Sequence, residues 1–241
     1  METTLHVLIN GQDVNHDKLV TNKTLIELCS NITMYQGFLC GHTSVEGISP
    51  VSWIIMGWKM EVLKRVRMFS AVSVETWIQS SSKVRILRNY AIYDERKELI
   101  AKAAGEWVAV DGITGNFIRI TPALLDPYDI REDRNCFPGY RFPALRNTDL
   151  PVTDTKTVIP GLQMVDYNGH IHNSEYVNLA GEIFPRGLTC DETEVIYRTQ
   201  ILPNEPVLLE LSCDEEKHTV AVRSPKDHSL HALVIFKNVN D

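Results

Sequence analysis

Apolar residues recur at every third or fourth position in two parts of the chain, and strand-like segments follow each time. The first stripe begins near Thr24 and consists of Leu25, Leu28, Cys29, Ile32, Tyr35 and Leu39. This spacing is typical of a helix with one buried face. Thr24 and Glu27 have the spacing of a capping box, while Thr21 and Asn22 are equally acceptable caps. The pattern therefore predicts a helix that begins near Thr24.

Segments rich in Val, Ile, Trp and Tyr follow this helix, and this composition is typical of β-strands. They span residues 51–63, 72–79, 83–94 and 99–110. Two polar stretches beside them, YDERKE and VDGITG, are typical of hairpin turns. With a short strand ahead of the helix, the first half is predicted to pack one helix against an antiparallel sheet.

The second half repeats this order of elements. A helical stripe runs from Ser174 to Phe184, and Pro185 is expected to help end that helix. Strand-like segments follow at 194–202, 207–213, 218–223 and 230–239. Between the halves, residues 121–157 are dense in Pro, Asp, Arg and Asn, which favours a linker or surface crossover. The duplicated order predicts an α+β fold.

Polar residues alternate just ahead of the second stripe, in the stretch VDYNGHIHNS. Asp166, Asn168 and His170 are spaced two residues apart. In an extended segment alternate side chains share one face, so we expect these three to point the same way. Each also has an ordinary interpretation, because Asp166 is an acceptable helix cap and Asn168 with Gly169 is typical of a turn. Their coincidence ahead of a helix nevertheless favours a ligand-binding site.

A similar stretch in the first half supports a duplication. In QDVNHDKL, Asp13 and Asn15 match Asp166 and Asn168, whereas Asp17 stands where the second half has its histidine. The first copy therefore lacks the histidine. We predict a duplicated unit in which only the second copy carries the chemistry.

Composition and charge narrow the classes of function. A formal net charge of −7 argues against nucleic-acid binding, which needs clustered Lys and Arg. The first residues lack the pattern of a signal peptide, and no apolar stretch approaches the length of a membrane span. The five cysteines are an odd number without metal-ligand spacing. We therefore expect reduced thiols, no metal site and a cytoplasmic location.

The motif and the duplicated order together resemble the acyl-ACP thioesterase family. In that family the second of two hotdog domains opens with Asp-x-Asn-x-His-x-Asn-Asn and runs into its central helix. Asp166, Asn168, His170 and Asn173 stand at the matching places, with His172 replacing the first Asn of the final pair. Residues 56–111 are also similar to the first sheet of the family. The resemblance implies two tandem hotdog domains, each a long helix wrapped by an antiparallel β-sheet.

The same resemblance implies a function and a division of the chain. The protein would hydrolyse fatty acyl-ACP to free fatty acid and holo-ACP, without a cofactor. Residues 1–122 would form the domain with the acyl-chain pocket, 123–157 the crossover and 158–241 the catalytic domain. Acyl carrier protein would be the partner, and association into homodimers is left open. An acyl-CoA thioesterase is the nearest alternative.

Thioester hydrolysis needs an aimed water, a base for its proton and donors for the developing oxyanion. We assign acid/base chemistry to His170, and either direct activation of water or orientation of the imidazole to Asp166. Asn168 would contact the thioester carbonyl or hold the water. Backbone N–H groups near Asn173 and Ser174, in the first turn of the helix, are the expected substrate-binding donors.

One position departs from the family pattern. The family usually has a glutamate in the first strand after the second helix, and in EVIYRTQIL this place is taken by Gln200. A glutamine amide can orient a water but cannot accept a proton near neutral pH. We therefore expect Gln200 to position the water. The substitution also leaves a non-catalytic protein that binds acyl-ACP or acyl chains as a second alternative.

A local basic cluster contains Lys59, Lys64, Arg65 and Arg67. In an acidic protein, such a cluster could be a docking patch that speeds the encounter with acidic acyl carrier protein. An ordinary solvated strand face is the preferred interpretation.

Overall fold

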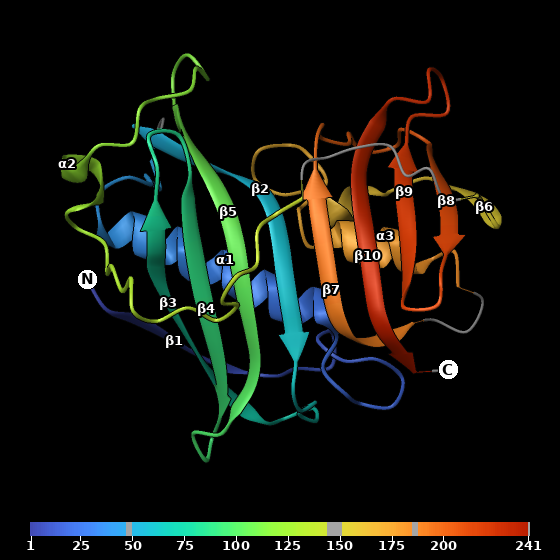
Figure 1. The fold of residues 1–241 in the computed structure, drawn as a ribbon, viewed down its shortest axis with the longest axis horizontal. Coiled ribbons are helices and arrows are strands. Elements are labelled where there is room, and N and C mark those ends of the chain that lie inside the picture. Colours follow the sequence, from blue (N-terminus) through green and yellow to red (C-terminus); the bar gives the residue numbers. More distant parts are fainter. Residues whose placement is uncertain (47–49, 144–150, 185–187, 241) are drawn as a thin grey trace. The chain divides into compact units, whose positions relative to one another are not determined.

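The computed structural model describes residues 1–46, 50–143, 151–184 and 188–240. The chain divides into two compact units, Met1–Arg141 and Phe142–Asp241, whose elements are labelled in Figure 1. The division falls inside the segment 123–157 that the sequence assigns to a crossover. The domain limits given above stay a prediction. Among the described residues, no helix combines the length and apolar character needed to cross a membrane.

The first unit has the predicted order of elements. It contains β1 (Thr3–Leu8), α1 (Asn22–Leu39), β2 (Val51–Val62), β3 (Ala71–Ser81), β4 (Ile86–Asp94), β5 (Leu99–Asp111) and the short helix α2 (Pro122–Leu125). Its strands pair antiparallel in the order β1-β3-β4-β5-β2. The limits predicted for β2 to β5 agree with these to within three residues. Enrichment in Val, Ile, Trp and Tyr thus located these strands well.

Helix α1 begins at a side-chain cap. Thr21 Oγ1 accepts a hydrogen bond from the backbone N of Thr24 at 3.1 Å, so Thr21 is the cap among the alternatives that the sequence left open. The predicted stripe is right for Leu25, Leu28, Cys29 and Ile32, which are buried. It is wrong for Tyr35 and Leu39, which are exposed.

Polar contacts replace the apolar stripe at the end of α1. Gln36 Oε1 accepts a hydrogen bond from the buried guanidinium of Arg88 in β4 at 2.5 Å. One turn earlier, Thr33 Oγ1 lies 2.7 Å from the hydroxyl of Tyr90. Buried polar groups need such partners, so these bonds fix which face of the helix meets the sheet. Tyr35 therefore points away from the core.

Aromatic side chains fill the interior of the first unit. The Trp58 ring contacts those of Tyr90 and Trp107, with centroids 5.2 and 5.6 Å apart. Gly105 pairs with Trp58 across strands β2 and β5. A Cβ atom at Gly105 would lie 2.6 Å from Trp107 Nε1 and 3.0 Å from the Trp58 ring. The packing of these rings therefore requires glycine at this position.

The second unit repeats the strand order of the first. It contains β6 (Asp154–Val158), a 3-10 turn (Leu162–Met164), α3 (Glu175–Gly181), β7 (Thr189–Tyr197), β8 (Val207–Cys213), β9 (Lys217–Arg223) and β10 (Leu230–Asn240). Its strands pair antiparallel in the order β6-β8-β9-β10-β7. Element for element, this is the order β1-β3-β4-β5-β2 (Figure 1).

Several predictions for the second unit are wrong. Helix α3 is confined to Glu175–Gly181, so it is not the long helix that the stripe from 174 to 184 predicts. Strand β6 lies in the segment assigned to the crossover, where it pairs with β8 and is mostly exposed. Its exposed sequence DTKTV has little of the apolar alternation that marks a strand. Pro185, expected to end the helix, lies outside the described residues.

Strand β7 begins and ends earlier than the predicted 194–202. It covers Thr189–Tyr197, because its polar first residues pair with the end of β10. Lys237 of β10 makes ion pairs with Glu194 at 3.1 Å and Glu192 at 4.0 Å. Strand pairing and ion pairs thus hold the polar start of β7 in the sheet, and a search for apolar residues alone does not predict this part of the strand.

The segments that lead into the two helices make corresponding backbone hydrogen bonds. The bond from Thr21 N to Asp13 O in the first unit corresponds to the bond from His172 N to Met164 O in the second. Likewise, the bond from Asn15 N to Leu19 O corresponds to that from Asp166 N to His170 O. This correspondence matches Asn15 with Asp166 and Leu19 with His170. The predicted match of Asp13 with Asp166 is therefore wrong by two positions. The first copy still lacks the histidine, because leucine stands in its place.

We expect Gly105→Ala to lower the free energy of unfolding of the first unit by about 1–3 kcal/mol, because overpacking displaces well-packed rings. Guanidinium unfolding followed by tryptophan fluorescence reports on this unit, since all tryptophans of the chain lie in it. Gly11→Ala is the matched control, because its Cβ would meet Met68 Sδ at an ordinary 3.8 Å. Coinciding unfolding curves for the two variants would contradict the packing described.

Candidate functional site

Asp166, Asn168 and His170 lie in one tight turn ahead of α3. Asp166 N donates to His170 O at 2.8 Å, and Gly169 N donates to Asp166 O at 3.0 Å. Gly169 has a φ of +83°, a left-handed conformation that glycine adopts without steric cost. The predicted extended segment is therefore wrong, and the Asn-Gly turn is the correct interpretation.

The Asp166 carboxylate holds this turn together. Its Oδ1 accepts hydrogen bonds from the backbone N of Asn168 at 2.8 Å and of His170 at 3.4 Å. Its Oδ2 accepts one from Asn168 Nδ2 at 3.4 Å. A carboxylate that bonds the N–H two residues ahead forms an Asx turn. Asp166 thus contacts the backbone of His170 and not its ring. The expected hydrogen bond by which this carboxylate would orient the imidazole is therefore not formed.

The imidazole of His170 is available to a ligand. His170 is half-buried, whereas Asn168 is exposed. Within the described part of the chain, neither ring nitrogen of His170 has a hydrogen-bond partner. The turn therefore presents a free imidazole next to an exposed amide, with the neighbouring carboxylate already engaged.

The start of α3 is capped from within the chain. His172 Nδ1 accepts a hydrogen bond from Ser174 N at 3.3 Å and lies 2.8 Å from Ser174 Oγ. His172 O accepts one from Glu175 N at 2.9 Å. The N–H groups of Ser174 and Glu175 are thus engaged, although the sequence assigns the first turn to the oxyanion. Ser174 is also fully buried.

Two tyrosines, the buried Tyr176 and the half-buried Tyr197, fasten the helix start. Tyr197 Oη donates to Asn173 O at 2.7 Å, and the Tyr176 ring packs edge-on against the Tyr197 ring at 5.1 Å. Burial raises the pKa of both hydroxyls, so both stay protonated and can donate. The charge of Asp166 raises the pKa of Tyr176 further.

Gln200 lies in the loop after β7 and not on the strand where the sequence places it. Tyr176 Oη accepts a hydrogen bond from Ile201 N at 3.0 Å and donates to Thr199 O at 3.4 Å. Ile171 N donates to Ile201 O at 3.0 Å. These bonds hold the loop on both sides of Gln200 and bring it beside the turn that precedes α3. Gln200 itself is exposed.

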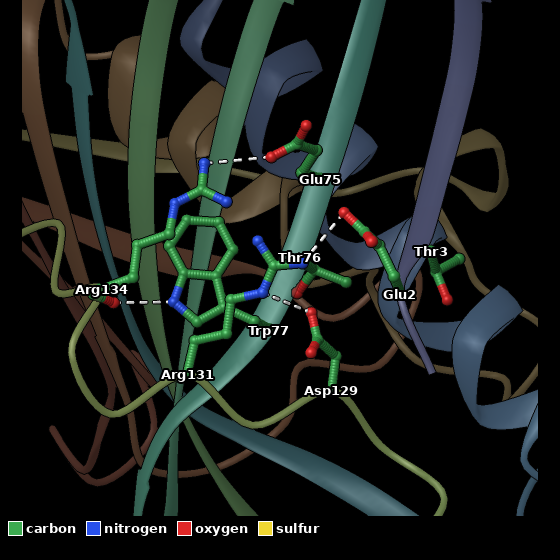
Figure 2. A pocket seen from close by; sticks show the side chains of 8 residues that line it. All are labelled: Glu2, Thr3, Glu75, Thr76, Trp77, Asp129, Arg131 and Arg134. Atoms are coloured by element: carbon green, nitrogen blue, oxygen red, sulfur yellow. Dashed lines mark hydrogen bonds and ion pairs between the residues drawn. The ribbon is translucent and has the colours of Figure 1, made fainter.

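A pocket in the first unit, drawn in Figure 2, contains none of these residues. It is lined by Glu2, Thr3, Glu75, Thr76, Trp77, Asp129, Arg131 and Arg134. Arg131 makes ion pairs with Glu2 and Asp129 at 2.9 and 2.8 Å, and Arg134 pairs with Glu75 at 3.0 Å. All five charged groups of the pocket are therefore engaged in ion pairs, and the pair of Arg134 with Glu75 fastens the segment 129–134 onto strand β3.

The basic cluster is largely engaged within the first unit. Lys59 is buried, with Nζ 4.7 Å from the Tyr140 ring centroid. Lys64 makes ion pairs at 2.9 and 2.6 Å with two carboxylates of the β4–β5 turn, and Arg65 donates to Val20 O at 2.8 Å. Arg67 is exposed. The solvated or structural interpretation of this cluster is therefore favoured over a docking patch.

A family model described as "Acyl-ACP thioesterase N-terminal domain" matches residues 2–128, more than half of the chain. The chain belongs to the acyl-ACP thioesterase family. Oleoyl-acyl carrier protein thioesterase 2 of Arabidopsis thaliana is 22% identical, over 96% of this chain and 72% of that protein. Thioesterase 1 of the same plant is 21% identical, over 83% and 60% of the two chains.

Solved structures show that the chain has the fold of this family. An acyl-ACP thioesterase from Bacteroides thetaiotaomicron matches with a TM-score of 0.80 at 18% identity, covering 99% of this chain and 98% of that one. A putative oleoyl thioesterase from Lactobacillus plantarum matches with a TM-score of 0.79 at 17% identity, covering 100% and 98%.

For this acyl-ACP thioesterase family member, sequence reasoning selected the residues of the turn but missed the group that joins the turn to the Gln200 loop. Tyr176 appears in the sequence as one apolar position of a helical stripe. Its hydroxyl has no signature in that stripe, because its partners Thr199 and Ile201 are distant in sequence. These hydrogen bonds form only because the folded chain packs α3 against the end of β7, which the sequence pattern of the helix does not reveal.

We expect Asp166→Ala to weaken the turn by about 1 kcal/mol, because two backbone N–H groups lose their acceptor. Asp166→Asn keeps an oxygen at Oδ1 and should change stability by less than ~0.5 kcal/mol. Hydrogen exchange at the amides of Asn168 and His170 measures the difference, and faster exchange is expected in the alanine variant alone. Equal protection in both variants would show that the carboxylate does not hold the turn.

Proposed function

We propose that this protein is a thioesterase that hydrolyses fatty acyl-ACP to free fatty acid and holo-ACP. The observation that carries the proposal is membership of the acyl-ACP thioesterase family. Its relatives are named for oleoyl-ACP and palmitoyl-ACP thioesterase activity. The turn with a free imidazole beside an amide supplies groups suited to this reaction.

We further propose that the two units are tandem hotdog domains. The common strand order of the units supports this interpretation. In this proposal residues 1–122 hold the acyl chain, 123–157 form the crossover and 158–241 carry the catalytic groups. Acyl carrier protein is the proposed partner. A cytoplasmic location is also proposed, because five cysteines without a disulfide are typical of a reducing compartment. Homodimer formation stays a prediction.

The proposed mechanism uses the exposed groups of the turn. His170 acts on the thioester through its free imidazole, and the Asn168 amide donates to the carbonyl oxygen, where negative charge develops. Asp166 is a positioning residue, because it holds the backbone of His170 in the turn. Gln200 holds the attacking water. Asn173 and Ser174 contribute by fixing the start of α3, since their contacts lie within the protein.

We expect the purified protein to release thiol from acyl-ACP, and His170→Ala to lower kcat by about 100-fold or more, the usual contribution of a group placed where charge develops in the transition state. KM should change little. His6→Ala is the control, because His6 is an exposed histidine on β1 and should leave turnover unchanged.

A panel of acyl-ACP and acyl-CoA substrates of several chain lengths makes this test decisive. Thiol release from acyl-ACP supports the proposed function. Release from acyl-CoA alone would replace it with the acyl-CoA alternative. A gel shift of acyl-ACP without thiol release would replace it with a binding protein.

A further inference from the structure

A histidine outside the sequence motif lies beside the Gln200 loop. His231 Nδ1 lies 3.1 Å from Thr199 Oγ1. The carbonyl of His231 accepts hydrogen bonds from the backbone N of Arg198 at 2.9 Å and of Thr199 at 3.2 Å. Thr199 immediately precedes Gln200, so His231 adjoins the place where the family pattern has its glutamate.

A β-bulge at the start of β10 sets the direction of this histidine. In the pairing of β10 with β9, Leu230 faces Arg223 and Ala232 faces Val222. His231 is therefore the extra residue between two regular pairs. A bulge re-aims the side chain of its extra residue, and bulges are common next to active sites. Here the bulge brings the imidazole to the loop that leaves β7.

The contacts of the Thr199 hydroxyl favour one tautomer of His231. Leu230 O, 3.3 Å from Thr199 Oγ1, can only accept a hydrogen, so the arrangement that satisfies both contacts of the hydroxyl has His231 donating to Thr199 Oγ1. Nδ1 is then the protonated nitrogen, and a lone pair is left on Nε2 of the neutral ring. Within the described residues, Nε2 has no hydrogen-bond partner. The lone pair on this nitrogen is therefore accessible to a hydrogen-bond donor such as water.

Thr199 also connects His231 to the turn that precedes α3. Its carbonyl accepts the hydrogen bond from Tyr176 Oη, while its hydroxyl contacts His231. Two residues further on, Ile201 O accepts a hydrogen bond at 3.0 Å from the backbone N of Ile171, which adjoins His170. One residue thus fixes the His231 ring and ties its loop to the proposed site.

We propose that His231 is the general base of this thioesterase and takes the role that Gln200 cannot fill. The inference rests on the proposed function. Nε2 of His231 takes a proton from the water that Gln200 holds, while the water oxygen bonds to the thioester carbon. The C–S bond then breaks with its electron pair on sulfur, and the proton passes from Nε2 to the thiolate. The products are the free acid and the carrier's thiol.

His170 has a separate part in this scheme. Its imidazole donates a hydrogen bond to the oxyanion, together with the Asn168 amide. Base and oxyanion donor then come from two segments, the bulge of β10 and the turn before α3.

The experiment compares His231→Ala, His231→Gln and the control His6→Ala in hydrolysis of acyl-ACP. Both His231 variants should lose about 100-fold or more in kcat, with KM little changed, because a positioned base contributes that much. The glutamine variant keeps an amide that can donate to Thr199 Oγ1, so its loss of activity does not come from a disturbed bulge. Added imidazole should restore part of the activity of His231→Ala.

Gln200→Glu is the second arm of the experiment. If His231 already serves as base, a new carboxylate should raise kcat by less than about threefold, far below the full contribution of a base. A rise of about 100-fold would overturn the proposal, because it would show that the site lacks a base.

The results separate this inference from the proposed function. Hydrolysis by the wild type that persists in both His231 variants would overturn the role of His231 and leave the thioesterase function intact. A wild type that hydrolyses no acyl-ACP would overturn both.

Discussion

The hydroxyl of Tyr176 is the group on which the arrangement of the candidate site depends. It accepts a hydrogen bond from Ile201 N and donates one to Thr199 O, so it holds the backbone on both sides of Gln200. Tyr176 is buried. In such surroundings the free-energy cost of leaving a hydroxyl or amide unpaired exceeds the net stabilisation that its hydrogen bond provides. The loop therefore has one favourable position, against the start of α3, and every other group of the site is placed relative to it.

The first unit fastens the same junction with different chemistry. There Val20 N donates to Val66 O, as Ile171 N does to Ile201 O in the second unit. The junction is completed by Arg65, whose guanidinium donates to Val20 O at 2.8 Å. The guanidinium of Arg65 thus fastens this junction in the first unit, and the buried hydroxyl of Tyr176 fastens it in the second. The backbone frame is therefore the same although the polar groups differ. Only the second frame has a histidine at the position of His170, because the first has Leu19 there and its His16 lies elsewhere in the turn.

Apolar periodicity predicted the elements whose position is decided by burial alone. Strand β8 was placed correctly because its alternating residues, from Val207 to Cys213, end in turns at both sides. Strand β7 was misplaced because ion pairs between Lys237 and two glutamates hold its polar end in the sheet. The turn at Asp166 was read as extended because spacing of two residues does not reveal the left-handed φ of Gly169. The sequence thus found the residues of the turn but not their geometry.

The part of the site that no sequence pattern reveals is the one that depends on strand register. His231 is the extra residue of a bulge, and a bulge is a property of how two strands pair. The backbone N–H groups at the start of α3, which the sequence assigns to the oxyanion, are engaged by His172. The helix also spans only Glu175–Gly181, so its dipole is short. The groups left with free hydrogen-bonding capacity are side chains from the turn and the bulge. In the proposed reaction the donors would consequently come from the turn before α3 and the base from the bulge of β10.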